Sequence, residues 1–402
     1  MGVNMRGILY SIIAALLVIP VIGLILFNSQ LIEKNVDINI RSNELEYFSI
    51  SIEEDLDRFL KIAGRRALIS AVSKVITTGV PLVDAQANLT EMISNGTLDG
   101  AIAPLIDTNS LNLWKESVTN IANISGFRVD FQSTRINITQ NDSYNVLFEA
   151  NVFLNISDPH VKMGALKNLS IKTAIPIEGI EDPLFPLRTY GRVKRVIQTS
   201  NFSNFAKNLT TGTIASKYGS GNATFSLVGI NGQKIFITSE MNDGDFALLN
   251  ASGGIVSEGT HVPVGLYPPY IVDAVGASSS INESERIYLD SQTKMVWDLQ
   301  NLTTFVKNKY YKTSVDGPSF LDRLEGRLNL SSKYKYGLET FVNLDELSSE
   351  ELNVSYQYSC LDYLYWNNTP GSSIRSVGYD AIFSWLRIDS NHANIYGVNE
   401  LI

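Results

Sequence analysis

The chain has 402 residues, of which 44% are hydrophobic and 18% are charged, which is enough apolar material for more than one folded unit. Its formal net charge is −9 and it contains no long run of lysine or arginine, so it has no basic surface that would neutralise the phosphates of a nucleic acid. The only cysteine, Cys360, excludes an intramolecular disulfide framework and a cysteine-based zinc site.

The first predicted element is a membrane-spanning helix. The run "ILYSIIAALLVIPVIGLILF", from Ile8 to Phe27, has no charged residue. At about 1.5 Å per residue it would span roughly 30 Å, the thickness of the hydrocarbon core of a bilayer. A cleaved secretory signal is the alternative, although its apolar part is usually about 7–15 residues long and ends in small residues. Because Arg6 precedes the run, the positive-inside rule predicts that residues 1–7 are cytoplasmic and that the rest of the chain is extracellular.

After the span we expect a polar stalk at residues 28–50 that interrupts the helix, and a new helix beginning at Ser51. Ser51 and Glu54 fit a capping box, which is typical of a helix start. Apolar residues recur at helical spacing from Ile52 to Val75, and Gly79 is placed to end the helix.

A second helix is predicted at Leu111–Ile124, with Trp114, Val118 and Ile121 on one face and Gly126 just beyond its end.

Three strands are predicted next, because apolar and polar residues alternate along each of them. They lie near Phe127–Thr139, Tyr144–Ser157 and Leu169–Ile177, and "QNDS" joins the first two as a hairpin turn. The apolar phase of the first strand slips between Phe131 and Ile136, which predicts a bulge. Residues 51–192 are therefore expected to form an α+β domain of helices on an antiparallel sheet.

The rest of the chain is expected to form a second mixed, β-rich domain at residues 193–316. Asn231-Gly232 is a strong hairpin-turn signal within it. Residues 317–402 are rich in aromatic side chains and are expected to pack on the preceding domain. The predicted fold class is thus α+β, with an N-terminal transmembrane helix followed by an ectodomain of two or three units.

The pattern Asn-x-Ser/Thr, the acceptor of N-glycosylation, is over-represented. It occurs at 16 of the 35 asparagines, against a chance expectation of about five or six. The acceptors are Asn88, Asn95, Asn123, Asn137, Asn141, Asn155, Asn168, Asn201, Asn208, Asn222, Asn250, Asn282, Asn301, Asn329, Asn353 and Asn367. All of them follow the predicted span, and the strand pattern places Asn155 and Asn168 on polar faces. The sequence therefore predicts an exported glycoprotein.

The candidates for catalysis or metal binding are few. His160, His261 and His392 are too far apart in sequence to form a local metal motif. Asp243 and Asp245 resemble the start of a calcium loop, but the later acidic ligands are missing, so we expect a turn there.

Cys360 could be a nucleophile beside His392 and Asp389, but a lone cysteine is more often a small core residue. Tyr363–Trp366 could stack on sugars, although core packing is the expected role. Arg65-Arg66 is expected to form a solvated or ion-paired face. We therefore predict no catalytic residue, no cofactor and no metal site.

Five stretches resemble a group of uncharacterised, membrane-anchored exported proteins of archaea, chiefly methanogens. They are "SIEEDLDRFLKIAGRRALISAVSKVITTG" (Ser51–Gly79), "IEGIEDPLFPLRTYGR" (Ile177–Arg192), "GPSFLDRLEGR" (Gly317–Arg327), "YGLETFVN" (Tyr336–Asn343) and "WLRIDSNHANIYG" (Trp385–Gly397). The resemblance implies an archaeal cell surface, where N-glycosylation occurs with little use of disulfides, and it transfers no catalytic residue.

The N-terminus "MGVNMRG" followed by "ILYSIIAALLV" resembles an archaeal prepilin leader, which implies cleavage after Gly7. Two non-enzymatic hypotheses follow. The first is a single-pass, glycosylated envelope protein that acts in surface structure or adhesion. The second is a type IV pilin-like or pilus-associated subunit. A third hypothesis is an exported hydrolase that uses paired carboxylates. The expected partners are the membrane, through Ile8–Phe27, and other envelope or pilus proteins.

Overall fold

The computed structural model describes residues 5–200, 299–373 and 383–396, together with the backbone of eight strands between residues 206 and 298. It has the predicted α+β composition of helices and small antiparallel sheets. The chain divides into two compact units whose residues alternate along the sequence. Unit 1 contains Met1–Ser70, Ala87–Ile138 and Leu147–Ile175, and unit 2 contains Ala71–Gln86, Thr139–Val146 and Pro176–Ile402. The predicted domain ranges stay a prediction.

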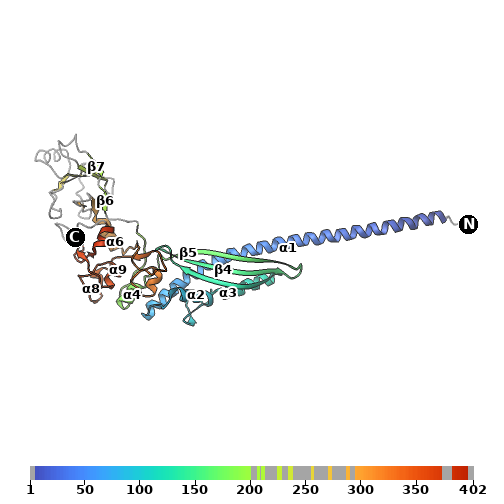
Figure 1. Cartoon of the computed structure of the whole chain (residues 1–402), viewed down its shortest axis with the longest axis horizontal. Helices are drawn as coiled ribbons and strands as arrows, with labels where there is room; N and C mark the ends of the chain where they lie inside the picture. Colours follow the sequence, from blue (N-terminus) through green and yellow to red (C-terminus); the bar gives the residue numbers. More distant parts are fainter. Residues whose placement is uncertain are drawn as a thin grey trace. The chain divides into compact units, whose positions relative to one another are not determined.

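The dominant element is α1, one helix of 74 residues from Met5 to Thr78 (Figure 1). Its second half has an apolar face with a helical repeat. The buried residues of this face are Leu45, Ile52, Leu56, Leu60, Ala63, Ala67, Ala71 and Val75. Gly79 ends the helix in the left-handed conformation, with a φ of 65°, and its N–H donates to the carbonyl oxygen of Val75 at 2.9 Å.

The predicted interruption of the helix at residues 28–50 was wrong. Ser51 lies inside α1, where its hydroxyl donates to the carbonyl oxygen of Phe48 at 2.7 Å instead of capping a helix start. Leu45 is buried, and Phe48 is stacked on Phe127 with ring centroids 5.4 Å apart. Because these residues extend the apolar face by about two turns on the N-terminal side of Ser51, packing favours helix over residues 45–50.

The expected membrane span, Ile8–Phe27, is helical as part of α1. Its side chains lie outside the described residues, apart from Ile22 and Leu24. Among the residues that the structure does describe, no helix combines the length and the apolar character needed to cross a bilayer.

Unit 1 is built on a three-stranded antiparallel sheet with the order β3-β4-β5. The strands are β3 (Arg128–Thr139), β4 (Asn145–Asp158) and β5 (Met163–Pro176), so β5 begins six residues earlier than expected. In β4 every second residue from Val146 to Ile156 is buried, as predicted. In β3 the less exposed positions shift from odd numbers to even ones between Phe131 and Thr134, which agrees with the predicted slip of phase.

Helices α1 and α3 cover the same face of this sheet. Helix α3 runs from Leu111 to Ile124, the predicted bounds. Its buried residues are Leu111, Trp114, Val118 and Ala122, and they share one apolar cluster with α1 and with the inward side chains of the strands. Ile121, which was expected on this face, is 56% exposed, because the buried positions follow a spacing of three, four and four residues. Helix α2 (Ala85–Asn95) and the short hairpin of β1 (Thr97–Leu98) and β2 (Ala101–Ile102) precede α3.

Unit 2 is made of short elements. Its helices are α4 (Leu184–Thr189), α6 (Leu299–Lys307), α7 (Phe320–Leu324), α8 (Leu344–Ser349), α9 (Asp362–Trp366) and α10 (Ser390–Ile395). Two small antiparallel pairs join β14 (Lys312–Ser314) to β15 (Gly337–Glu339) and β16 (Ser372–Ser373) to β17 (Arg387–Ile388). One apolar cluster, which includes Phe305, Phe341, Cys360 and Trp385, is shared by α4, α6, α8, α9, α10 and β17.

Two further sheets lie between residues 206 and 298. One has the order β10-β11-β9-β8-β7 and the other β12-β13-β6. The strands are β6 (Ala206–Asn208), β7 (Thr210–Gly212), β8 (Thr224–Val228), β9 (Lys234–Thr238), β10 (Ile255–Ser257), β11 (Tyr270–Asp273), β12 (Ile287–Leu289) and β13 (Met295–Asp298). Val228 pairs with Lys234, as expected of a hairpin, while the predicted turn at Asn231-Gly232 lies outside the described residues.

The small residues of α1 set its distance from the sheet. A Cβ atom added at Gly64 would lie 3.1 Å from the Cγ1 of Ile175 and 3.3 Å from the Cδ2 of Phe148. We therefore expect the variant G64L to lower the free energy of unfolding by about 1–3 kcal/mol, the usual cost of overpacking.

The control for this prediction is R58L, on an exposed turn of the same helix. Such a surface change should alter the free energy by less than about 0.5 kcal/mol. Chemical denaturation of the full chain in detergent, followed by circular dichroism, measures both variants. Equal effects of G64L and R58L would contradict the close approach.

Candidate functional site

The predicted glycan acceptors lie at the surface wherever the structure describes them. Asn88 and Asn155 are half-buried, and no described acceptor is buried. The exposed acceptors are Asn95, Asn123, Asn137, Asn141, Asn168, Asn329, Asn353 and Asn367. The side chains of Asn201, Asn208, Asn222, Asn250, Asn282 and Asn301 lie outside the described residues. The described acceptors are thus compatible with attached oligosaccharides, whose occupancy stays a prediction.

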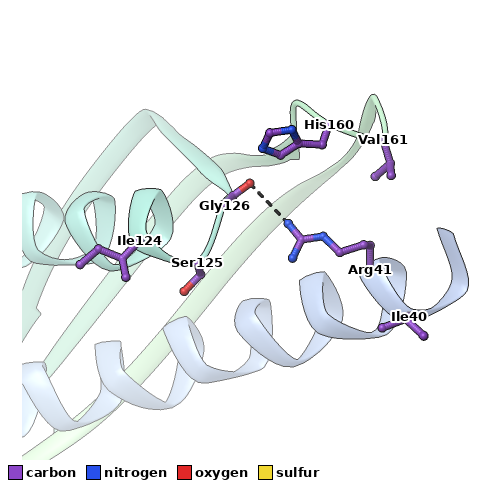
Figure 2. A pocket seen from close by; sticks show the side chains of 7 residues that line it. All are labelled: Ile40, Arg41, Ile124, Ser125, Gly126, His160 and Val161. Atoms are coloured by element: carbon purple, nitrogen blue, oxygen red, sulfur yellow. Dashed lines mark hydrogen bonds between the residues drawn. The ribbon is translucent and has the colours of Figure 1, made fainter. Parts of the chain in front are cut away.

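A cavity of about 520 Å3 opens at one end of unit 1 (Figure 2). Its walls come from α1, from the segment that follows α3 and from the turn between β4 and β5. The lining residues are Ile40, Arg41, Ile124, Ser125, Gly126, His160 and Val161. Figure 2 shows the side chain of Arg41 reaching from α1 toward the carbonyl group of Gly126.

Arg41 is the charged group of this cavity, and its guanidinium is fully engaged. It donates from Nε to the Oδ2 of Asp158 at 2.7 Å, from Nη1 to Glu44 at 2.8 Å and from Nη2 to the carbonyl oxygen of Gly126 at 3.5 Å. The guanidinium also lies 4.6 Å from the centre of the Phe127 ring. The hydrogen bonds that Arg41 donates to Asp158 and Glu44, together with the charge of both carboxylates, raise the pKa of Arg41.

Asp158 fixes the turn between β4 and β5. Its side chain is fully buried, and its Oδ1 accepts the backbone N–H groups of His160 at 2.8 Å and of Val161 at 3.3 Å. Burial alone would raise the pKa of Asp158, but these hydrogen bonds and the Arg41 guanidinium outweigh burial and hold the pKa below its ordinary value. Because two carboxylates neutralise Arg41, the cavity does not attract anions, and the pair joins α1 to the hairpin instead.

His392 in unit 2 lies between two carboxylates. Its Nδ1 is 2.8 Å from the Oδ2 of Asp389, and its Nε2 is 3.6 Å from the Oε2 of Glu339. The hydroxyl of Tyr363 lies 2.9 Å from the same Nε2. Burial lowers the pKa of His392, but the two carboxylates outweigh it and raise the pKa to about 9. A protonated imidazole donates from both nitrogens, so it cannot accept a proton as a general base at neutral pH.

A second buried group of charges surrounds Arg323. Its Nη1 donates to the Oδ2 of Asp182 at 2.6 Å and forms an ion pair with the Oδ2 of Asp362 at 2.7 Å, and all three side chains are fully buried. The hydroxyl of Tyr311 also donates to Asp182 at 2.7 Å. Burial raises the pKa of Asp362 to about 6 in spite of Arg323. These are paired carboxylates, and neither side chain has any solvent-exposed surface.

Cys360 is a buried core residue, as expected. The structure brings His392 and Asp389 together, and Asp389 accepts a hydrogen bond from Ser359 at 3.1 Å. The Cys360 sulfur instead lies 3.5 Å from the carbonyl oxygen of Trp385 and accepts the N–H of Arg387 at 3.2 Å. Burial raises the pKa of the thiol to about 12, so the nucleophilic thiolate is disfavoured.

The remaining candidates from the sequence either pack in the core or on a helix surface, or lie outside the described residues. Tyr363 and Tyr365 are buried in the apolar cluster of unit 2, which confirms core packing for the Tyr363–Trp366 segment. Arg65 and Arg66 are half-buried on α1. His261, Asp243 and Asp245 lie outside the described residues. Within the described part of the chain, no group of three or more histidine, cysteine or acidic side chains is placed to hold a metal ion.

Sequence reasoning missed the buried charges. Asp182, Arg323, Glu339 and His392 lie far apart in the sequence, in segments that local patterns assign to loops or short elements. Local periodicity assigns a charged residue to the surface, so only pairing across the fold explains why these positions are charged.

Comparison with known proteins found no match to a protein-family profile, to a characterised protein or to a solved structure.

The Arg41–Asp158 pair generates a stability prediction. The variant R41M would leave the buried Asp158 carboxylate without its cation, and we expect a loss of about 1–3 kcal/mol in the free energy of unfolding. The matched control is R58M on the same helix, whose ion pair with Glu54 is exposed and should contribute less than about 1 kcal/mol. Thermal unfolding of the full chain compares the two, and an R41M variant no less stable than R58M would rule out this role.

The His392 cluster predicts a pH dependence. The pKa of His392 is about 9 in the folded state, against about 6.5 for an ordinary histidine, so its contribution is complete below pH 6.5 and disappears as the pH rises through 9. The full contribution is about 3 kcal/mol.

We expect H392Q to be less stable at pH 6 and to lose the fall in stability between pH 6.5 and 9. The exposed His160 supplies the control variant H160N, which should keep that fall. Urea unfolding at a series of pH values makes the comparison. If the stability of H392Q fell with rising pH as steeply as that of the native chain, the charge on His392 would not be the cause of the fall.

Proposed function

We propose that the chain is a membrane-anchored, N-glycosylated protein of an archaeal cell surface, built as a type IV pilin-like or pilus-associated subunit. In this proposal the apolar segment Ile8–Phe27 anchors the chain, residues 1–7 face the cytoplasm until they are cleaved off, and the bulk of the chain is extracellular. Its partners are the membrane and other envelope or pilus proteins, and its role is not catalytic.

The single observation that carries the proposal is the continuity of α1. A pilin-like subunit requires one helix that is apolar at its start and that packs on an antiparallel sheet in its second half. Helix α1 runs unbroken from Met5 to Thr78, and its residues from Leu45 onward share an apolar cluster with β3, β4 and β5. The leader-like "MGVNMRG" stands directly before its apolar part, which supports the same assignment.

The surface of the described chain supports export. Its described acceptors are exposed or half-buried, and the single cysteine is inaccessible. The chain contains unit 2 in addition to the helix and sheet of unit 1. This additional unit favours a role in display or adhesion at the cell surface over a role as a repeated building block.

The hydrolase hypothesis has no support from the observed carboxylates. Asp182 and Asp362 both pair with the Nη1 of Arg323, but both side chains are fully buried. Glycoside hydrolases need two accessible carboxyl groups on opposite sides of the substrate bond.

Mass spectrometry of the mature N-terminus tests the pilin-like assignment. We expect the protein isolated from its native membrane to begin at Ile8. The variant G7V, which changes the residue before the cleaved bond, should keep residues 1–7, while the control G2V should still be processed. A native protein that begins at Met1 or Gly2 would remove the pilin-like assignment and leave a simple membrane anchor.

A further inference from the structure

The strand β5 is a long edge strand. It has 14 residues, and in the order β3-β4-β5 its only strand neighbour within the described chain is β4. The backbone N–H and C=O groups on its other side are therefore a template on which a strand of a second molecule could pair. Leu166 is 64% exposed on this strand, which adds an apolar contact for such a partner.

Lysines protect parts of this edge. Lys167 has the inward phase of the strand and is half-buried, and Lys172 is exposed on the outward phase, 3.4 Å from Glu149 of β4. Inward-pointing charges and edge lysines are common devices against strand pairing. The stretch between these two lysines has no further charge.

Asn168 lies in this uncharged stretch and is a glycan acceptor. Asn168 and Ser170 are both exposed, and because they are two residues apart on a strand, both side chains point to the outer face of the sheet. The inward face is occupied by α1 and α3. An oligosaccharide on Asn168 would therefore stand on the solvent side, next to the open edge.

Acceptors on the other two strands share this outer face. Asn137 of β3 hydrogen-bonds to Glu149 of β4, which pairs with Lys172 of β5, so polar contacts cross all three strands on one side. Asn155 of β4 lies on the same side, since its neighbours Leu154 and Ile156 are buried. Each of the three strands thus carries one acceptor within it, on the face opposite to the helices.

We propose that N-linked oligosaccharides on Asn137, Asn155 and Asn168 cover the outer face of this sheet, and that the one on Asn168 prevents the β5 edge from pairing with a second copy of the chain. A glycan is bulky and hydrated, so a strand that approached β5 would have to displace it. The inference rests on the exported location in the proposed function, but not on the pilin-like assembly.

Glycopeptide mapping of the protein from native membranes is the first test. We expect all three acceptors of the sheet to be occupied. If other acceptors such as Asn353 are occupied and Asn168 is not, the inference fails while the exported location stands. If no acceptor is occupied, both the inference and the glycoprotein assignment fail.

Removal of the glycan is the second test. In N168Q and S170A, which change exposed positions, we expect the self-associated fraction of the full chain in detergent to rise about threefold or more, as measured by light scattering after gel filtration. The matched control N353Q removes an exposed acceptor from unit 2 and should leave this fraction unchanged.

A rescue variant separates the glycan from the asparagine itself. K172N combined with A174T, in the N168Q background, creates a new acceptor four residues along the same outward face. Lys172 and Ala174 are both exposed, so the strand should tolerate the change, and the variant K172Q with Asn168 intact measures how much edge protection is lost with the lysine itself. We expect glycosylation at residue 172 to lower the self-associated fraction to that of the native chain. An N168Q variant that stays as monomeric as the native chain, or a glycosylated rescue variant that still associates, would overturn the proposal.

Discussion

The close packing of α1 on the sheet of unit 1 is the constraint on which the rest of that unit depends. Gly64 lies where even a Cβ atom would come within 3.1 Å of Ile175, and Ala63 and Ala67 flank it on the buried face. Small residues bring the helix backbone near the strands, and the larger side chains of β4 fill the space between them. This packing also decides the two faces of the sheet. One is closed by α1 and α3, and the other is left for polar residues and glycan acceptors.

The same constraint explains why α1 continues as a helix on the N-terminal side of Ser51, back to Arg41. Each further apolar contact with the sheet stabilises the helical conformation of α1. Leu45 and Phe48 therefore extend the packed part of the helix toward the N-terminus. Arg41 then anchors the helix to the β4–β5 turn through the buried Asp158. Arg41 lines a cavity, but Asp158 and Glu44 already neutralise its charge. Its role there is therefore structural, and it does not bind an anion.

Unit 2 is held together in a different way. Its helices and strands are short, and buried or mostly buried charges link them. Arg323 connects Asp182 with Asp362, and His392 connects Asp389 with Glu339. Buried charges of this kind are tolerated only when all partners are present, so they specify one arrangement of the chain more than they add stability. Without disulfides, such pairing over long sequence separations gives a loop-rich unit a defined core.

The sequence by itself determined the local helices and strands, and which face of each is polar. The bounds of α3, the phase of β4 and the turn at Gly79 all follow from periodicity and from glycine, because these patterns depend on neighbours within a few residues. The acceptor count likewise needs no structure. Tertiary packing decided what local patterns could not: the helix through residues 41–50, the exposure of Ile121, and the burial of Asp182, Arg323 and His392. Those outcomes depend on partners far away in the chain, whose distances are set only when the whole unit folds.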